Sequence, residues 1–320
     1  MKILITGAAG FIGFHISRKL CEEGYDVAGI DNINSYYDVR LKESRLDILK
    51  KFKNFKFEKI DLAEKEQLRD YFKRERPEIV VNLAAQPGVR YSISHPDESV
   101  RNNINTFFNL LECCREFPVR KLIYASSSSV YGNTDKIPFS VNDNVDNPVS
   151  LYAATKKTNE LMAYTYHHLY NLPVTGLRFF TVYGPYGRPD MAYFSFSEKI
   201  VKDIPIEIFN NGDMKRDFTY VDDVTESVCR LVKKEIVNEY RIFNIGGEHP
   251  VNLLYFVETL EKNLGKEAKK VFREMQPGDV KITVADSSEL ADYIGYKPET
   301  KIEDGLEKFV TWFKEYYNYN

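Results

Sequence analysis

A tyrosine and a lysine stand four residues apart in the segment Ser150-Leu151-Tyr152-Ala153-Ala154-Thr155-Lys156. On a helix, residues at this spacing share one face, about one turn apart. A free phenol has a pKa of about 10 and is almost entirely neutral at pH 7, so a tyrosine that acts as a base needs a nearby cation. The Lys156 ammonium would supply that cation, and the pair predicts abstraction of a hydroxyl proton by Tyr152.

Four hydroxyls follow an apolar run upstream of this pair, at Ser126, Ser127, Ser128 and Ser129. The carboxyl end of a central strand is where ligands of open parallel sheets bind. Taken alone, a serine run is more often a loop, and a Tyr-x-x-x-Lys spacing often arises by chance. Their joint occurrence after a glycine-rich turn indicates a catalytic site.

That glycine-rich turn follows the first expected strand, residues 2–6. Its early glycines allow a tight turn and a close approach to a pyrophosphate, whose charge meets the amides at a helix N-terminus. The last glycine lets the helix pack against the sheet. The spacing is Gly-x-x-Gly-x-x-Gly rather than the commoner Gly-x-Gly-x-x-Gly, and a purely structural turn is the alternative. The predicted cofactor contacts here are Gly7, Gly10, Phe11, Ile12 and Gly13.

An acidic residue, Asp31, ends the next expected strand, 18 residues beyond Gly13. An acid there hydrogen-bonds a ribose diol and would repel the extra phosphate of NADP. No arginine adjoins Asp31 in the sequence, so the predicted cofactor is NAD; a turn-capping role for Asp31 is the alternative. Further cofactor contacts are expected after the following strands, at Asn32, Asp61, Leu62, Leu83, Ala84 and Ala85.

The elements that would position these residues alternate along the first half of the chain. Short β-rich runs separated by helix-length stretches occur at residues 2–6, 26–31, 56–60, 79–83, 121–126 and 173–179. Their continuous apolar character is typical of strands buried on both faces. We therefore predict an α/β fold, a doubly wound parallel Rossmann sheet, with residues 1–180 as the NAD-binding domain. Residues 181–320 would form a smaller, interleaved substrate-binding domain, with 222–248 packing back onto the first.

Composition narrows the class of protein further. The net charge of −3 comes from interspersed charges that form no basic field for nucleic acid. No apolar run approaches the ~18 residues of a membrane span, and the start of the chain lacks the pattern of a secretion signal. The four cysteines and five histidines lack metal-ligand spacing, so no metal site is predicted. Buried, reduced thiols are the expected state of the cysteines, which favours a cytoplasmic protein.

Taken in order, these motifs resemble the extended short-chain dehydrogenase/reductases over essentially the whole chain, including the segment Arg216-Asp217-Phe218-Thr219-Tyr220-Val221-Asp222-Asp223. The segment from Arg178 to Ala192, RFFTVYGPYGRPDMA, is similar to the signature of UDP-glucuronate 4-epimerases. This resemblance implies an isomerase that inverts carbon 4 of UDP-glucuronate through a 4-keto sugar, with transient hydride transfer to NAD. It also implies Tyr152 as the base, Ser127 orienting the 4-hydroxyl, and Ser128 and Ser129 at the sugar.

Two residues suggest an acidic sugar. UDP-galactose 4-epimerases carry asparagine where this chain has Thr181, and they lack an equivalent of Arg188. An arginine fork binds a carboxylate through two charge-assisted bonds, with Thr181 as a neutral donor. A loop position or a salt bridge is the alternative for Arg188. By resemblance, Arg216 would meet the diphosphate and Asp279 would lie near the uridine ribose, while Gln276 stands where UDP-galactose epimerases commonly have arginine.

Other readings remain open. A UDP-glucuronate decarboxylase shares the fold, the cofactor and the first hydride step. A 4,6-dehydratase would tend to carry an Asp-Glu pair where Ser127 and Ser128 stand. Non-catalytic NAD-sensing or RNA-binding members of this fold have usually lost the tyrosine or the lysine. Relatives dimerise through the region of the expected helices 97–116 and 151–170, whose aromatic residues suggest a homodimer, with an ordinary core as the alternative.

Overall fold

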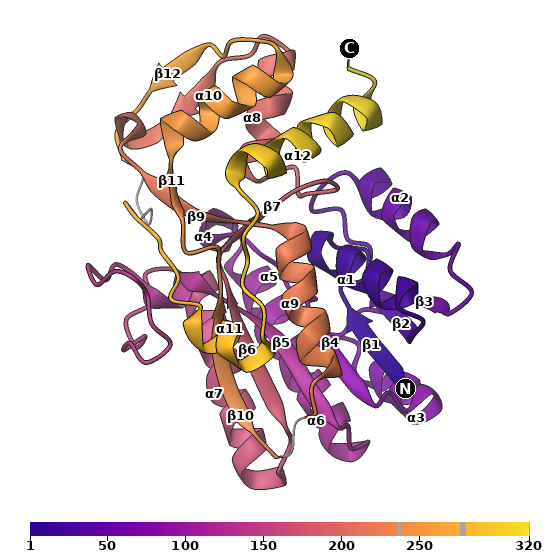
Figure 1. Cartoon of the computed structure of the whole chain (residues 1–320). Helices are drawn as coiled ribbons and strands as arrows, with labels where there is room; N and C mark the ends of the chain where they lie inside the picture. The colour runs from indigo at the N-terminus through magenta and orange to yellow at the C-terminus, as the bar shows by residue number, and fades with distance from the viewer. Residues whose placement is uncertain (236–237, 276–279, 320) are drawn as a thin grey trace. The chain divides into compact units, whose positions relative to one another are not determined.

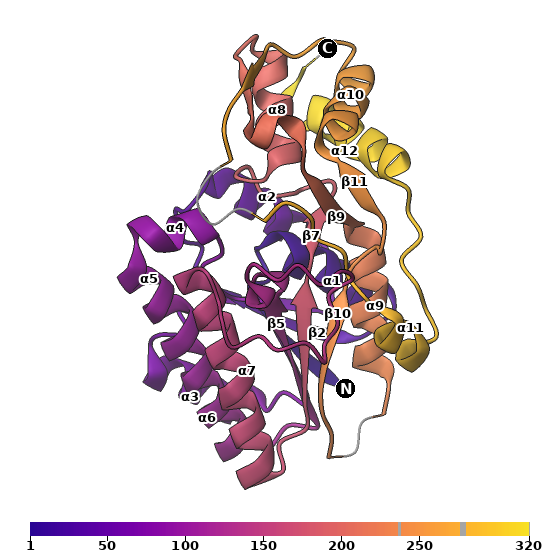
Figure 2. The ribbon, with the colours of Figure 1, turned by 90° about the vertical axis from the view of Figure 1, so that its left-hand side faces the viewer.

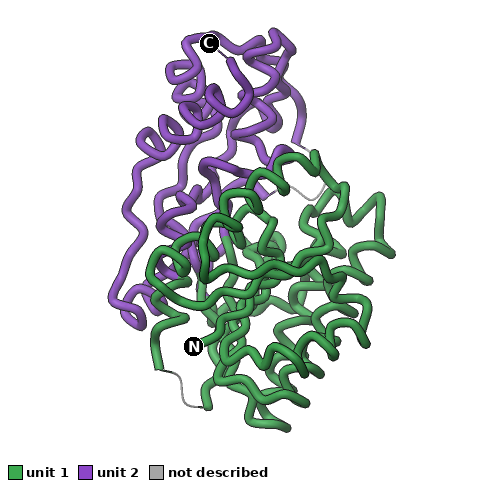
Figure 3. The backbone as a smooth tube through the Cα atoms, turned by 90° about the vertical axis from the view of Figure 1, so that its right-hand side faces the viewer, with its two compact units in different colours: residues 1–134, 141–179, 228–244 green, residues 135–140, 180–227, 245–320 purple. Residues whose placement is uncertain are grey.

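The structure is a computed structural model that describes residues 1–235, 238–275 and 280–319. The chain divides into two compact units, each made of several segments (Figure 3). Unit 1 comprises residues 1–134, 141–179 and 228–244, and unit 2 comprises residues 135–140, 180–227 and 245–320. The prediction that NAD binds to the first part of the chain and the UDP-sugar to the second stays a prediction.

Unit 1 is built on a seven-stranded sheet (Figure 1). Its strands are β1 (Lys2–Thr6), β2 (Asp26–Asp31), β3 (Phe55–Lys59), β4 (Ile79–Asn82), β5 (Lys121–Ser127), β6 (Val174–Phe179) and β10 (Tyr240–Ile245). They are ordered β10-β6-β5-β4-β1-β2-β3, and neighbours from β3 to β6 pair in parallel. The order reverses between β1 and β4, which confirms the doubly wound prediction. Strand β10, which lies within the residues 222–248 predicted to pack back onto the first domain, joins this sheet.

Helices follow most of these strands. They are α1 (Phe11–Glu22), α2 (Val39–Leu49), α3 (Lys65–Glu75), α4 (Val89–Ser94), α5 (Pro96–Val100), α6 (Thr106–Glu116) and α7 (Leu151–Tyr170). Helices α3, α6 and α7 lie side by side along one face of the sheet (Figure 2). The helix expected at 97–116 is instead α5 and α6 joined by a π-helical turn, Arg101–Asn105. Single π turns of this kind are frequent at functional sites.

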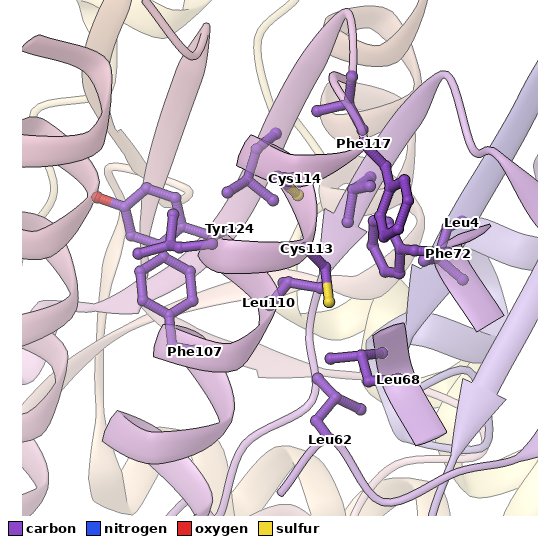
Figure 4. Close-up of a cluster of buried hydrophobic side chains, with 14 of the residues drawn as sticks. Leu4, Leu62, Leu68, Phe72, Phe107, Leu110, Cys113, Cys114, Phe117 and Tyr124 are labelled. Carbon is purple, nitrogen blue, oxygen red and sulfur yellow. The ribbon is translucent and has the colours of Figure 1, made fainter. Parts of the chain in front are cut away.

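The core beneath α3 and α6 is apolar and closely packed. Figure 4 shows Leu4 of β1, Phe72 of α3 and Tyr124 of β5 among the side chains of this cluster. Cys113 and Cys114 of α6 belong to it as well. All four cysteines are buried and unbridged, which confirms the predicted thiols. Burial of this kind supplies most of the stabilisation of a domain of this size.

Unit 2 contains two small sheets. The first has the order β11-β9-β7 and the second β12-β8, with strands β7 (Thr181–Tyr183), β8 (Ile206–Ile208), β9 (Lys215–Tyr220), β11 (Pro250–Asn252) and β12 (Lys270–Phe272). Its helices are α8 (Ala192–Val201), α10 (Leu253–Leu264), α11 (Ser288–Ile294) and α12 (Ile302–Tyr317), and α9 (Val221–Lys233) crosses the division between the units. Aromatic rings of α8 and α12, among them Tyr193, Phe194 and Phe309, pack on one another.

None of the helices in the described part of the chain has the length and apolar character required to cross a membrane. The same residues form no group of three or more His, Cys, Asp or Glu side chains that could hold a metal ion.

Candidate active site

The three glycines of the first turn each occupy a place where a side chain would collide. Gly7 has φ 70, and a Cβ there would lie 2.8 Å from the Ala84 nitrogen. A Cβ on Gly13 would lie 2.1 Å from the Gly7 carbonyl oxygen, so α1 packs directly on the turn. The Gly10 amide donates to that same oxygen at 2.9 Å. Phe11 and Ile12 open the helix, where amides have no intrahelical acceptor and can bind a pyrophosphate.

Thr6 fixes the neighbouring edge of this turn, a role that the sequence reasoning missed. Its hydroxyl donates to Oδ1 of Asn82 at 2.6 Å and accepts from the amides of Leu83 and Ala84 at 3.2 and 3.1 Å. The end of β4 is thereby held against Gly7, where the predicted contacts Leu83, Ala84 and Ala85 follow the strand. A threonine directly before the first glycine was the available signal.

Asp31 is buried at the end of β2 and faces the same turn. Its carboxylate accepts from the Ala9 amide at 3.2 Å and the Ile33 amide at 2.8 Å. Burial raises the pKa of this carboxyl, and the Ile33 and Ala9 amides with the charges of Lys42 and Arg45 oppose that rise. No arginine is next to Asp31 in the sequence, but the prediction that none lies near it is wrong. Helix α2 brings Arg45 and Lys42 close enough for their charges to act on the carboxylate.

The other predicted cofactor residues lie after β2 and β3. Asn32 accepts from the Asn34 amide at 3.1 Å. Asp61 accepts from the Ala63 amide at 2.9 Å, and its second oxygen accepts from Arg101 of the π-helical turn at 3.2 Å. The Leu62 carbonyl accepts from Asn109 of α6 at 2.9 Å. These bonds fix the backbone after β3 in place.

Lys156 is held between α7 and the sheet. Its ammonium donates to the Ala125 carbonyl of β5 at 2.9 Å and lies 5.9 Å from the centroid of the Tyr152 ring. Its side chain is buried, and that burial lowers the pKa of Lys156 to about 8. Tyr152 stands in the first turn of the helix, where Ser150 caps the N-terminus by accepting from the Ala153 amide at 3.1 Å. The pair therefore combines a phenol with a desolvated cation, as general base chemistry requires.

The serine run turns away from the sheet directly after Ser127. The Ser127 hydroxyl donates to the Ser129 hydroxyl at 3.1 Å and accepts from its amide at 3.2 Å. A short 3-10 turn, Ser128–Tyr131, follows. Since Ala125 precedes Ser127 by two residues, Lys156 is bonded to β5 close to the carboxyl end at which Ser127 lies.

The predicted sugar-acid residues belong to unit 2. Thr181 opens β7 opposite Phe218 of β9. The Arg188 guanidinium lies on Asp190 through two bonds, with Nε 3.0 Å from Oδ1 and NH2 2.5 Å from Oδ2. The alternative of a salt bridge is thus what the structure shows for Arg188, and its role at a sugar carboxylate stays a prediction.

The diphosphate prediction falls on the same unit. Arg216 of β9 donates through NH1 to the carbonyls of Lys215 and Lys281, at 3.0 and 3.1 Å. Asp279 and Gln276 lie outside the described residues. The roles of Arg216 and Asp279 at UDP stay predictions.

Residues 3–246 match the model of the NAD dependent epimerase/dehydratase family. "Protein CapI" of Staphylococcus aureus is 55% identical over 99% of both chains. "UDP-glucuronate 4-epimerase" of Thermodesulfobacterium geofontis is 44% identical over 98% of this chain and 96% of its own length. The crystal structure of UDP-glucuronic acid 4-epimerase from Bacillus cereus, in complex with UDP-glucuronic acid and NAD, superposes with a TM-score of 0.92 at 36% identity, covering 99% of this chain and all of that one. The family match confirms NAD as the cofactor.

Proposed function

The chain belongs to the NAD dependent epimerase/dehydratase family, and we propose that within it this protein interconverts UDP-glucuronate and UDP-galacturonate by inverting carbon 4 of the sugar. The observation that carries this proposal is the Tyr152–Lys156 pair on α7, with Lys156 hydrogen-bonded to β5, in a chain similar along its length to UDP-glucuronate 4-epimerases. Such an enzyme is an isomerase, since the sugar is oxidised and reduced again with no net change.

Tyr152 acts as the base in this proposal. It removes the proton of the 4-hydroxyl, Ser127 orients that hydroxyl, and the Lys156 ammonium favours the phenolate. Bound NAD would supply a reversible hydride acceptor for carbon 4, so that the hydride could return to the opposite face of the ketone. The glycine turn and Asp31 hold the cofactor, with the turn amides toward the pyrophosphate and the carboxylate toward the ribose.

Arg188 and Thr181 are proposed to grip the sugar carboxylate. A 4-keto hexuronate is a β-keto acid and loses carbon dioxide when the breaking bond aligns with the carbonyl, so the site must hold the carboxylate out of that alignment. Two parallel bonds from a guanidinium fix both the position and the plane of a carboxylate. In this proposal the substrate carboxylate takes the place that Asp190 now holds on Arg188.

Incubation with UDP-glucuronate, with and without added NAD, tests the activity. Proton NMR of the nucleotide sugars should show UDP-galacturonate and no UDP-pentose. A UDP-pentose would instead mean decarboxylation, and no turnover despite bound NAD would mean a non-catalytic member of the fold. Tyr152→Phe should keep NAD and abolish the reaction, and an active variant would remove Tyr152 from the mechanism.

The assembly and location are proposed as well. Helices α6 and α7 pack side by side and expose Phe108, Leu161 and Tyr164 by 41, 57 and 53%. Phe107 of the same region is buried in the core, so only some of the aromatic residues of these helices are exposed. A second copy of this chain is the proposed occupant of this surface, giving a homodimer. The unbridged cysteines support a cytoplasmic location.

A further inference from the structure

A charged pair is buried in unit 1, with its acidic member one turn of α7 beyond Lys156. Glu160 of α7 and Arg178 of β6 have side chains only 2 and 3% exposed. Arg178 donates through Nε to Oε1 of Glu160 and through NH2 to Oε2, both at 2.9 Å. The Ser126 hydroxyl donates to Oε1 as well, at 2.6 Å. Both carboxylate oxygens are therefore hydrogen-bonded.

The third guanidinium nitrogen extends the network to the serine turn. Arg178 NH1 donates to the Tyr131 hydroxyl at 3.0 Å, and that hydroxyl donates to Oδ1 of Asn244 on β10 at 2.6 Å. Tyr131 ends the 3-10 turn that carries Ser128 and Ser129. The pair thus reaches both ends of the serine segment, at Ser126 before Ser127 and at Tyr131 after it.

Glu160 also lies on the stripe of α7 that carries Tyr152 and Lys156. Glu160 follows Lys156 by four residues and Tyr152 by eight, so the three side chains share one helix face. Two adjacent residues of β5 receive this face, because Lys156 bonds to the Ala125 carbonyl and Glu160 to the Ser126 hydroxyl. The Lys156 ammonium links α7 to β5 through the Ala125 carbonyl. Glu160 adds a second link between the same helix and strand, and this link does not depend on the catalytic lysine.

Stability is a weak reason for such a pair. Removing two charges from water offsets much of their attraction, and an apolar pair of the same volume often stabilises a fold equally well. Unlike an apolar contact, a bidentate ion pair is directional: it fixes the plane of the two groups and their position relative to each other. Here the fork joins α7 to β6 and the Ser126 hydroxyl joins α7 to β5, so the arrangement suits a place where α7 must not slide along these two strands.

We propose that Glu160, held by Arg178, is a positioning residue for the reaction: it sets the height of α7 against β5 and the serine turn, so that Tyr152 and Lys156 stay in register with Ser127. This inference rests on the proposed function only in the choice of UDP-glucuronate as the substrate. Every group of the network lies in unit 1 and none is a predicted sugar contact.

Ser126→Ala is the sharpest test, since it removes one hydroxyl from the network and leaves the ion pair intact. Thr158→Ala is the matched control, because Thr158 lies on the same helix and its hydroxyl bonds only within that helix, to the Ala154 carbonyl at 2.9 Å. Turnover is expressed per mole of bound NAD, which corrects for any misfolded fraction. Arg178→Lys, which keeps the charge and loses the fork, is the second variant.

For Ser126→Ala we expect kcat to fall about tenfold with KM for UDP-glucuronate unchanged, since a hydrogen bond to a buried carboxylate is lost and the reacting groups shift. Arg178→Lys should show the same split between kcat and KM, and Thr158→Ala should match the wild type. The proposal is overturned if Ser126→Ala matches Thr158→Ala, or if its activity falls only in proportion to bound NAD. A wild type inactive on UDP-glucuronate would refute the proposed substrate instead, and the same comparison then applies to any UDP-sugar that the wild type does epimerise.

Discussion

The tyrosine and lysine of α7 differ in how firmly they are held. Lys156 is buried and bonded to the Ala125 carbonyl, whereas Tyr152 is half-buried at the first turn of α7. A buried cation close to a phenol lowers the free energy of the phenolate more than the same cation in water would, because the local dielectric is low. If Tyr152 is the base, as proposed, its activity should follow the ionisation of Lys156.

The pH profile of kcat/KM tests whether activity depends on the protonation of Lys156. Burial lowers the pKa of Lys156 from 10.5 to about 8, so the ammonium is lost over a range in which an ordinary lysine stays charged. We predict that kcat/KM, which reports ionisations of the free enzyme, falls as the pH rises through about 8. Lys156→Arg should move this alkaline limb upward, since a guanidinium stays protonated. A wild-type profile with no decline below 10.5 would contradict the role given to the buried ammonium.

Arg188→Ala tests the grip on the carboxylate. Loss of a desolvated arginine–carboxylate contact should reduce transition-state binding of UDP-glucuronate by about 2 to 5 kcal/mol, measured as kcat/KM. Any residual turnover of UDP-glucose should change far less, since that sugar lacks the charge. Asp190→Asn is the control, because it removes the partner of Arg188 and keeps the guanidinium. Equal losses on the two sugars would refute the role of Arg188.

At the scale of elements, the turn from β1 into α1 depends on the absence of side chains. Gly13→Ala would place a Cβ 2.1 Å from the Gly7 carbonyl oxygen, a contact with backbone that cannot rotate away. We expect the free energy of unfolding to fall by about 3 kcal/mol and bound NAD to be lost, as α1 moves off the turn. Thermal unfolding and the absorbance of released nucleotide measure the two effects.

Gly24→Ala provides the control for this variant. Gly24 follows the end of α1 with φ 87, and a Cβ there meets nothing within 4 Å. Only left-handed strain of about 1 to 2 kcal/mol is expected, with NAD retained. Full NAD occupancy in Gly13→Ala would show that the turn tolerates a side chain.

Much of this element structure was predictable from the sequence. The strands from β1 to β6 lie within one or two residues of the predicted runs, because strands buried on both faces carry a strong local signal. The glycine turn, Asp31 and the Tyr-x-x-x-Lys pair were identified by their residue types and their spacing along the chain. What spacing misses is contact between distant segments. Arg45 reaches Asp31 through the fold of α2, and Glu160 meets Arg178 through the pairing of α7 with two strands.

The Arg188 loop shows that contacts between residues close in the sequence are also hard to predict. The sequence identifies an arginine suited to a carboxylate, and the partner Asp190 stands only two residues away. Proximity in sequence does not decide whether two charged side chains point toward each other, because that depends on the turn between them. Here the Arg188 amide donates to the buried Tyr193 hydroxyl at 3.3 Å, which anchors the loop on α8.

At the scale of the whole molecule, the proposed homodimer depends on the exposed face of α6 and α7. Leu161 lies near the middle of α7 and is 57% exposed. Leu161→Lys should convert the dimer to a monomer, because a charge would have to be buried without a partner. Phe272→Lys is the control, since Phe272 is similarly exposed at 51% but lies on β12 of unit 2. Light scattering after size exclusion measures both, and a wild-type monomer would contradict the proposed assembly.

The central claim is that carbon 4 of the sugar is oxidised and reduced again within one site. UDP-glucuronate carrying deuterium at carbon 4, turned over in ordinary water, tests this claim most directly. Proton NMR of the product should then show UDP-galacturonate with no proton at carbon 4, because the hydride that leaves the sugar is the one that returns. A product with a solvent-derived proton at carbon 4, or one that has lost its carboxylate, would contradict the account.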